Sequence, residues 1–467
     1  MVRLFISLLI LSVIAFCAWG VIHIDRTYVL ILDPIRPGED KIEPSAGLVA
    51  AALAGALALA LMGGRIWQFF AALPGRIRER SAAHRKERGY VALTKGLAAV
   101  AAGDAKESAS LAKTSKSLLR DQRLTALLSA QSAQLQGKED VATDEFKLLL
   151  RDEETAFLGL RGLAMQALRQ DREVEALRHV RAAYALRPTA PWVLELLALL
   201  ELREGNVLAS IDALETSRKH GHLDISDAKD RLAPLYTHLA QDELAAGNTQ
   251  AAVQNATKAL DQDPLYLPAA LIGARALIDT GDLAQARTYI AKQWAKSPHP
   301  DFPDLYLEAS ETGTDPQKMR RSGLKLFKNN DGSQAMQLAL GELMLKCLDM
   351  EAAAPALEAA KAQGSKRAAE LRDLLPRLTN ILDDSEAGEN AASRQERARA
   401  LIEAALAGPQ EWEWTCTNCA ATHAAWQFRC HACDQTGTIQ WQDQGHPRAT
   451  RPKKQTLAGP RLLSGLN

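Results

Sequence analysis

The residues most suited to chemistry in this chain are four cysteines close to the end of the sequence. They form two Cys-x-x-Cys pairs, Cys416 with Cys419 and Cys430 with Cys433, separated by ten residues. Each pair is a tight turn that presents two sulfur atoms, and two such turns can complete a tetrahedron around one metal ion. Four thiolates leave no open coordination position, so the pattern predicts a structural metal site rather than a catalytic one.

Zinc is the ion that we expect at these cysteines, and iron is the alternative, because tetrahedral sulfur ligation accommodates both. His423 and His431 occur among the cysteines. With a complete set of four thiolates, we expect both histidines beside the site or in solvent rather than as ligands. Ala420 and Asp434 follow the two pairs, so the Cys-x-x-Cys-His motif of covalent haem attachment is absent from this region.

Aromatic side chains cluster around the cysteines, including four of the eight tryptophans of the chain. The cluster consists of Trp412, Trp414, Trp426, Phe428 and Trp441. So small a unit cannot bury a self-sufficient core, and we expect the metal and the aromatic residues to replace one. Alternating polar and apolar residues flank the cysteines and indicate short strands. Residues 411–443 are therefore predicted to form a β-rich four-cysteine module of the zinc-ribbon or rubredoxin-like kind.

The elements before this module follow a repeat of 34 residues. Its turn positions Gly103, Gly137, Asp171 and Gly205 are each 34 residues apart, and after a longer stretch Gly247 and Gly281 resume that spacing. Small residues also pair at a spacing of twelve, in Ala130/Ala142, Ala164/Ala176, Ala240/Ala252 and Ala274/Ala286. A helix-turn-helix unit of this length, with small residues where its helices cross, is the tetratricopeptide signature. Residues 89–380 are predicted to form an all-α solenoid of roughly seven to eight helix pairs.

Two apolar stretches near the N-terminus, residues 4–24 and 46–64, predict transmembrane helices within an anchor formed by residues 1–70. For the first stretch, a cleaved signal peptide is the alternative interpretation. The juxtamembrane segment 71–88 is basic, whereas the connection between the two stretches is acidic. The positive-inside rule then predicts an inner-membrane protein with both termini in the cytoplasm, where the cysteines would stay reduced.

Smaller features complete this domain plan. Gly47, Ala51 and Gly55 have the small-xxx-small spacing that lets two membrane helices approach, which suggests a homo-oligomer. A chance recurrence of small residues in this Ala/Gly-rich segment explains the spacing equally well. Residues 381–410 are predicted as a polar linker with a short helix, and residues 444–467 as a basic disordered tail. Lysine and arginine balance aspartate and glutamate at 56 each, so we expect no specific nucleic-acid partner.

Two N-terminal spans, a basic segment and a tetratricopeptide array, in that order, resemble the HemY family of bacterial inner-membrane proteins. The likeness lies in the opening MVRLFISLLILSVIAFCAWG, in the second apolar stretch and in KGLAAVAAGD at the first repeat. The resemblance implies a connection to haem (tetrapyrrole) biosynthesis. An oxidase activity is unsupported, because the sequence lacks a Gly-rich dinucleotide-binding fingerprint.

The C-terminal WTCTNCAATHAAWQFRCHAC is similar to the rubredoxin-type module of the LapB family of lipopolysaccharide assembly proteins. That resemblance implies a module packed on the repeats. It also implies a metal- or redox-responsive adaptor of a membrane protease in envelope lipid assembly. The second predicted span departs from that family, so this role is the alternative.

We find no metalloprotease HExxH, phosphate-binding Walker loop, nucleophile elbow or paired catalytic acids. The sequence therefore predicts a non-enzymatic scaffold without catalytic or cofactor-binding residues. Its partners would be cytoplasmic or inner-membrane proteins bound in the tetratricopeptide groove, together with the lipid bilayer.

Overall fold

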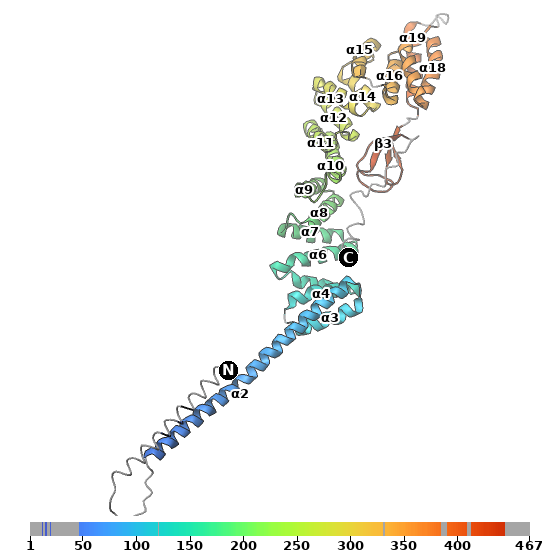
Figure 1. Ribbon diagram of the computed structural model, residues 1–467. Coiled ribbons are helices and arrows are strands. Elements are labelled where there is room, and N and C mark those ends of the chain that lie inside the picture. Colours follow the sequence, from blue (N-terminus) through green and yellow to red (C-terminus); the bar gives the residue numbers. More distant parts are fainter. Residues whose placement is uncertain are drawn as a thin grey trace, which may run out of the picture. The chain divides into compact units, whose positions relative to one another are not determined.

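The computed structural model describes residues 46–119, 121–329, 332–383, 390–408 and 412–443, together with residues 12, 15 and 19 (Figure 1). The chain divides into two compact units, Met1–Leu148 and Leu149–Asn467. Apart from those three single residues, the first predicted span lies outside the described residues. The predicted basic tail, residues 444–467, also lies outside them.

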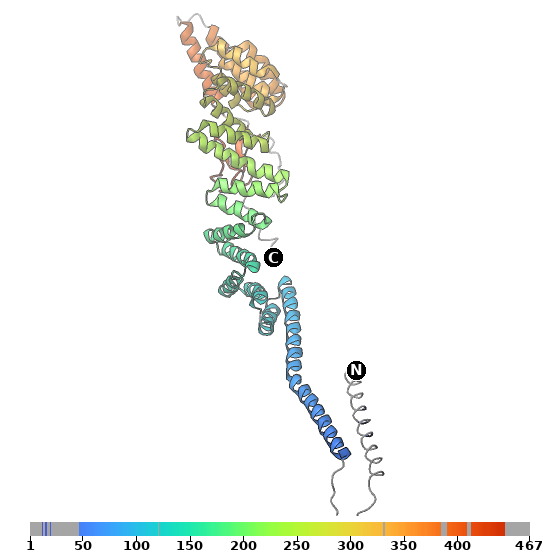
Figure 2. The same ribbon diagram turned by 90° about the vertical axis from the view of Figure 1, so that its left-hand side faces the viewer.

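The first unit begins with one helix of 56 residues, α2 (Ala46–Ala101), which Figure 2 shows as the long helix leading into the repeats. The second predicted span, the basic segment 71–88 and the first helix of the first repeat all lie within α2. Among the described residues, no helix combines the length and the hydropathy that a membrane crossing requires. Three shorter helices follow: α3 (Ala105–Leu118), α4 (Gln122–Leu135) and α5 (Glu139–Leu149).

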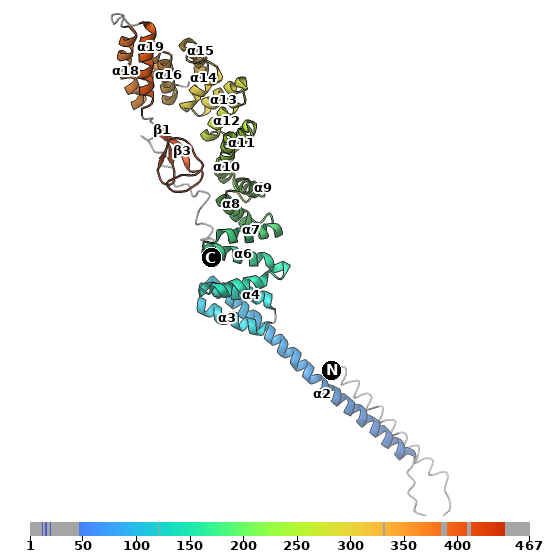
Figure 3. The ribbon, with the colours of Figure 1, turned by 180° about the vertical axis from the view of Figure 1, so that it is seen from behind.

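The second unit is a series of helices that pack on their sequence neighbours (Figures 1 and 3). Its helices are α6 (Glu153–Arg169), α7 (Glu173–Leu186), α8 (Pro191–Arg203), α9 (Val207–Lys219), α10 (Ile225–Ala245), α11 (Thr249–Gln262), α12 (Leu267–Asp279), α13 (Leu283–Lys296), α14 (Asp301–Ala309), α15 (Pro316–Leu326), the 3₁₀ turn η1 (Phe327–Asn329), α16 (Gln334–Lys346), α17 (Met350–Ala362), α18 (Lys366–Asp383) and α19 (Ala391–Leu406). The predicted helical solenoid is therefore present.

The turns of the repeat have the backbone conformation that their residue types suggest. At the six predicted turn positions φ is positive: Gly103 74°, Gly137 70°, Asp171 54°, Gly205 85°, Gly247 80° and Gly281 82°. The N–H of the residue after each of the first two glycines bonds back to a carbonyl five residues earlier, as in Lys138 N to Ala133 O at 2.9 Å. This bond closes the preceding helix and leaves the chain ready to begin the next one.

Small residues at the helix crossings are buried as the sequence predicts. All eight alanines of the four predicted pairs have no exposed surface. Side chains this small let antiparallel helices approach closely, and the stacked neighbours complete the core. Gly341 has the same role in a later repeat, because a Cβ atom there would lie 2.5 Å from Leu357 Cδ2.

One buried arginine side chain links the last helices of the solenoid. Arg367 on α18 is 3% exposed and its Nε bonds to Glu342 Oε1 at 2.6 Å. Its other nitrogens donate to the carbonyl oxygens of Leu406 and Gly408, which end α19. The short helix predicted within 381–410 thus packs on α18 as a further layer of the repeats.

The four-cysteine module contains the strands that the alternating pattern predicts. β1 (Trp412–Cys416) pairs antiparallel with both β2 (Thr422–His423) and β3 (Ile439–Asp443), in the order β2-β1-β3. The register sets Trp414 opposite His423 on one side and opposite Trp441 on the other. The first cysteine turn joins β1 to β2, and the second lies between β2 and β3 in the chain.

Candidate metal centre

The structure brings the four predicted cysteines together. Their sulfur atoms all lie within 4.8 Å of one another, and two separations, Cys416 to Cys433 and Cys419 to Cys430, are 3.7 Å. A tetrahedron with metal–sulfur bonds of about 2.3 Å has edges of about 3.8 Å. The spacing of the four sulfurs therefore fits a tetrahedral ion of the size of zinc or iron.

The two Cys-x-x-Cys turns have the same backbone design. In the first turn, Ala420 N donates to Cys416 O at 2.8 Å, and in the second, Asp434 N donates to Cys430 O at 2.9 Å. Ala420 and Asp434 have φ values of 60° and 58°, the left-handed conformation that lets each turn reverse tightly. The repeated geometry presents two pairs of sulfurs to one point.

The electrostatics of the sulfurs favour a bound cation. Burial disfavours the Cys416 thiolate, but the Thr438 hydroxyl and the backbone N–H groups of Cys419 and Asn418 outweigh it, and they lower the pKa of Cys416 to about 7. The backbone N–H of Ala421 favours a Cys419 thiolate, yet desolvation and the neighbouring sulfurs raise the pKa of Cys419 to about 12. Its hydrogen-bond donors therefore favour a thiolate at Cys416, and a metal cation would stabilise the thiolate of Cys419.

The two histidines of the module lie beside the sulfurs and outside the four-sulfur group. His423 is 8% exposed, and its Nε2 lies 3.5 Å from Cys430 Sγ. His431 is exposed, and its ring centroid lies 4.5 Å from that of His423. The sequence predicts that both histidines lie beside the site or in solvent, but it does not predict that His423 points at a sulfur.

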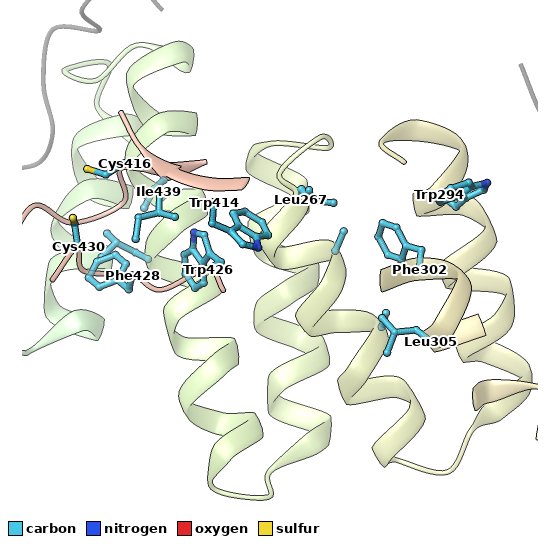
Figure 4. Close-up of a cluster of buried hydrophobic side chains, with 14 of the residues drawn as sticks. Leu267, Trp294, Phe302, Leu305, Trp414, Cys416, Trp426, Phe428, Cys430 and Ile439 are labelled. Carbon is cyan, nitrogen blue, oxygen red and sulfur yellow. The ribbon is translucent and has the colours of Figure 1, made fainter. Parts of the chain in front are cut away.

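The aromatic side chains of the module pack against the solenoid. Phe428 stacks on His238 of α10, and Trp426 meets Tyr266, which precedes α12, edge-on with centroids 6.5 Å apart. Figure 4 shows Trp414 and Trp426 near Leu267 at the start of α12. The aromatic residues that we predicted as a substitute core for the module thus form one continuous core with the repeats. The LapB resemblance implies this packing.

A third solenoid residue, His299, completes the packing between module and repeats. Its ring lies 4.3 Å from Trp441 and 5.7 Å from Trp414, measured between centroids. Sequence reasoning assigned none of His238, Tyr266 and His299 to this contact. No local pattern marks these residues, because their partners lie more than a hundred positions away in the sequence.

Comparison with protein families locates two parts of the chain. Residues 35–137 match the family described as HemY protein N-terminus, and residues 243–306 match a tetratricopeptide repeat family. The chain is a HemY-like tetratricopeptide repeat protein. Its four-cysteine cluster adds a module of the zinc-ribbon type to that plan. No curated protein matched the sequence of this HemY-like protein.

Several solved structures are similar to parts of the HemY-like chain. A tetratricopeptide repeat protein from Parabacteroides merdae is 18% identical, with 55% of this chain and 99% of that one covered and a TM-score of 0.23. MamA protein is 17% identical over 38% of this chain and 93% of its own, with a TM-score of 0.24. Pseudomonas aeruginosa pilF is 16% identical over 54% and 97%, also with a TM-score of 0.24. With scores this low, the repeat assignment depends on the helices and turns described above.

Proposed function

We propose that this protein is a non-enzymatic inner-membrane scaffold whose tetratricopeptide helices recruit cytoplasmic proteins to the bilayer. The observation that carries the proposal is an apolar surface on the first unit. Tyr90 and Leu97, seven residues apart on α2, are 50% and 41% exposed, and Leu124 and Leu135 on α4 are 43% and 40% exposed.

These four residues belong to the first helices of successive repeats, which pack side by side. Residues seven or eleven positions apart lie on one face of a helix, so each helix contributes one apolar stripe. In tetratricopeptide arrays, the groove used for protein ligands is lined by the first helices of the repeats. An apolar stripe of this kind suits an amphipathic helix or an apolar peptide of a partner protein.

A pair of matched variants tests the recruitment. Leu97→Glu/Leu124→Glu places two charges in the apolar stripe. The control Val174→Glu/Leu208→Glu changes two apolar residues elsewhere in the solenoid that are more exposed, at 63% and 66%. We expect the first variant to lose a stoichiometric partner that copurifies with the wild type from membranes, and the second to retain it. Equal recovery with both variants would contradict the proposed groove.

The membrane anchor forms the second part of the proposal. Its support is the apolar composition of residues 46–64 and the exposure of Leu57, Leu59, Leu61 and Met62 on α2, between 52% and 68%. We propose two spans with both termini in the cytoplasm, and contact between copies through Gly47, Ala51 and Gly55. Reporter fusions after residues 35 and 100 should report opposite sides of the membrane. Crosslinking between copies of the wild type should be lost in a Gly55→Leu variant if those contacts form the oligomer.

The resemblance to HemY supports a connection to haem biosynthesis, so the recruited proteins would include enzymes of tetrapyrrole synthesis. Mass spectrometry of the partner that is lost from the Leu97→Glu/Leu124→Glu variant tests this connection. A partner set without any such enzyme would argue against it.

For the metal, we propose that Cys416, Cys419, Cys430 and Cys433 bind one zinc ion, with iron as the alternative. The support is the tetrahedral sulfur spacing and the absence of a fifth donor from the group among the described residues. Metal analysis of the full chain in detergent should find one equivalent. A Cys416→Ser/Cys419→Ser variant should contain none.

The module packed on the solenoid also supports a second candidate function. A metal- or redox-responsive adaptor of a membrane protease in lipopolysaccharide assembly would need its metal site coupled to its partner-binding repeats. Aromatic contacts to α10 and α12 provide such a connection. If the Cys416→Ser/Cys419→Ser variant stays folded and binds every partner normally, this candidate fails.

A further inference from the structure

The two innermost sulfurs of the cysteine cluster each face a polar side chain from outside their own turn. Thr438 Oγ1 lies 3.1 Å from Cys416 Sγ, and His423 Nε2 lies 3.5 Å from Cys430 Sγ. These two cysteines are buried, at 1% and 0% exposure, whereas Cys419 is exposed to solvent. The sulfurs that water cannot reach are therefore the ones with side-chain neighbours able to donate.

The direction of the histidine hydrogen bond follows from its second partner. The amide Nε2 of Gln427 lies 2.8 Å from His423 Nδ1. An amide nitrogen can only donate, so Nδ1 accepts and the ring proton of the neutral imidazole lies on Nε2, facing Cys430. A metal-bound thiolate has no proton to give, so it requires the same tautomer. Both neighbours of His423 thus select one arrangement.

The backbone holds the ring in this position. His423 belongs to β2 and pairs with Trp414 of β1, and its side chain is 8% exposed. Thr438 directly precedes β3, where its carbonyl accepts from Thr417 N at 2.9 Å. One donor therefore lies in a strand of the sheet and the other directly beside one.

The need for such donors is electrostatic. Four thiolates around a divalent ion carry a net charge of minus two, and a buried charge is costly unless hydrogen bonds stabilise it. Groups that donate to metal ligands tune the affinity of the site, and their removal typically costs about 10- to 100-fold in metal binding.

We infer that His423 and Thr438 are positioning residues that each donate a hydrogen bond to one buried thiolate of the metal site, and that Gln427 sets the tautomer of His423. The inference rests on the proposed metal binding by the four cysteines. It assigns specific hydrogen-bonding roles to three residues that are not themselves metal ligands.

Zinc affinity and the cobalt spectrum of the full chain in detergent test these roles. Zinc affinity is measured by competition with a chromophoric chelator, and the sulfur-to-cobalt charge-transfer band reports the electron density on the thiolates. His423→Leu should lose about 10- to 100-fold in zinc affinity and shift the band. His423→Gln, whose amide nitrogen can occupy the place of Nε2, should restore most of both.

Three further variants separate the hydrogen bonds from packing. Thr438→Val preserves shape while removing the hydroxyl, and Gln427→Leu removes the donor that sets the tautomer, so both should weaken zinc binding and shift the band. His431→Leu removes the exposed neighbouring ring and should change neither readout. Because Thr438→Val and Gln427→Leu leave His423 in place, they keep the test informative if His423→Leu does not fold.

The outcomes distinguish the inference from the metal site itself. Wild-type affinity and spectrum in His423→Leu, Thr438→Val and Gln427→Leu would overturn the inference alone. A His423→Gln variant as weak as His423→Leu would reduce the role of the histidine to packing and overturn its assignment. A wild-type chain that binds neither zinc nor cobalt would overturn the proposed metal site, and the inference with it.

Discussion

The imidazole of His238 lies flat against the ring of Phe428, with 4.4 Å between centroids and 9° between planes. His238 belongs to α10 of the solenoid, and Phe428 lies between the two cysteine turns. The contact joins a cysteine module to repeats almost two hundred residues earlier in the chain. The metal site and the repeats therefore depend on each other for packing.

Metal removal should release the module from the solenoid. Without a cation, the sulfurs lose the ion that links the two turns, and a unit this small has little core of its own. Because Trp414 and Trp426 are 5% and 7% exposed in the packed state, their release should shift the tryptophan emission of the chain to longer wavelength. The far-ultraviolet circular dichroism should change little, because the helices have their own contacts.

A matched variant provides the control for this release. Phe428→Ala removes the stacked ring while all four cysteines remain, so it should show part of the emission shift with the metal still bound. An emission spectrum that stays constant after complete chelation would contradict the dependence of packing on metal.

Acid should weaken the packed state through His299. This residue is 3% exposed, its Nε2 has no hydrogen-bond partner among the described residues, and burial lowers its pKa to about 3. The unfolded chain takes up a proton near pH 6.5 while the folded chain stays neutral. Stability is therefore unaffected above about pH 6.5 and falls, by at most about 1.4 kcal/mol per pH unit, as the pH drops towards 3.

Denaturant titrations at several pH values measure this dependence. His299→Asn retains a polar side chain that does not titrate, so the difference between wild type and variant isolates the histidine from the acid lability of the metal site. Asp301 lies 3.7 Å away and favours the charged imidazole. Parallel pH profiles for the two chains would show that His299 does not control the acid response.

Asp171→Gly should stabilise the solenoid. Asp171 has a φ of 54° at a turn position where the neighbouring repeats have Gly137 and Gly205. An L-residue in this conformation costs about 1–2 kcal/mol relative to its preferred regions, although aspartate tolerates it better than most. We expect a gain of about 1 kcal/mol in the free energy of unfolding, and the reciprocal Gly205→Ala change should lose a similar amount. A destabilised Asp171→Gly variant would show that the carboxylate has a contact worth more than the backbone strain.

Arg367→Met should loosen the end of the solenoid. The change removes the partner of Glu342 and leaves the carbonyls of Leu406 and Gly408 without their donor. Breaking a buried ion pair from one side typically costs about 3–5 kcal/mol. Hydrogen exchange of α19 should rise accordingly. Lys346→Met, which removes the more exposed pair with Asp304, is the matched control and should cost less than about 1 kcal/mol.

Local patterns in the sequence determined much of this protein. The 34-residue spacing located the six turns with positive φ, and the spacing of twelve identified alanines that are fully buried. Each Cys-x-x-Cys pair alone predicted a turn that presents two sulfurs, because such a turn needs only its own backbone hydrogen bonds. These features depend on residues close together in the chain, where residue type and spacing specify the geometry.

Tertiary structure decided what the sequence left open. Only the folded chain shows α2 as one helix from residue 46 to residue 101, the aromatic residues of the module packed on α10 and α12, and His423 pointing at Cys430. Each of these side chains could lie in several environments. Which environment it has depends on segments that are distant in the sequence and that exclude water where they meet. Such contacts between remote segments leave no periodic signal in a single sequence, so the connection between metal site and repeats appears only in the fold.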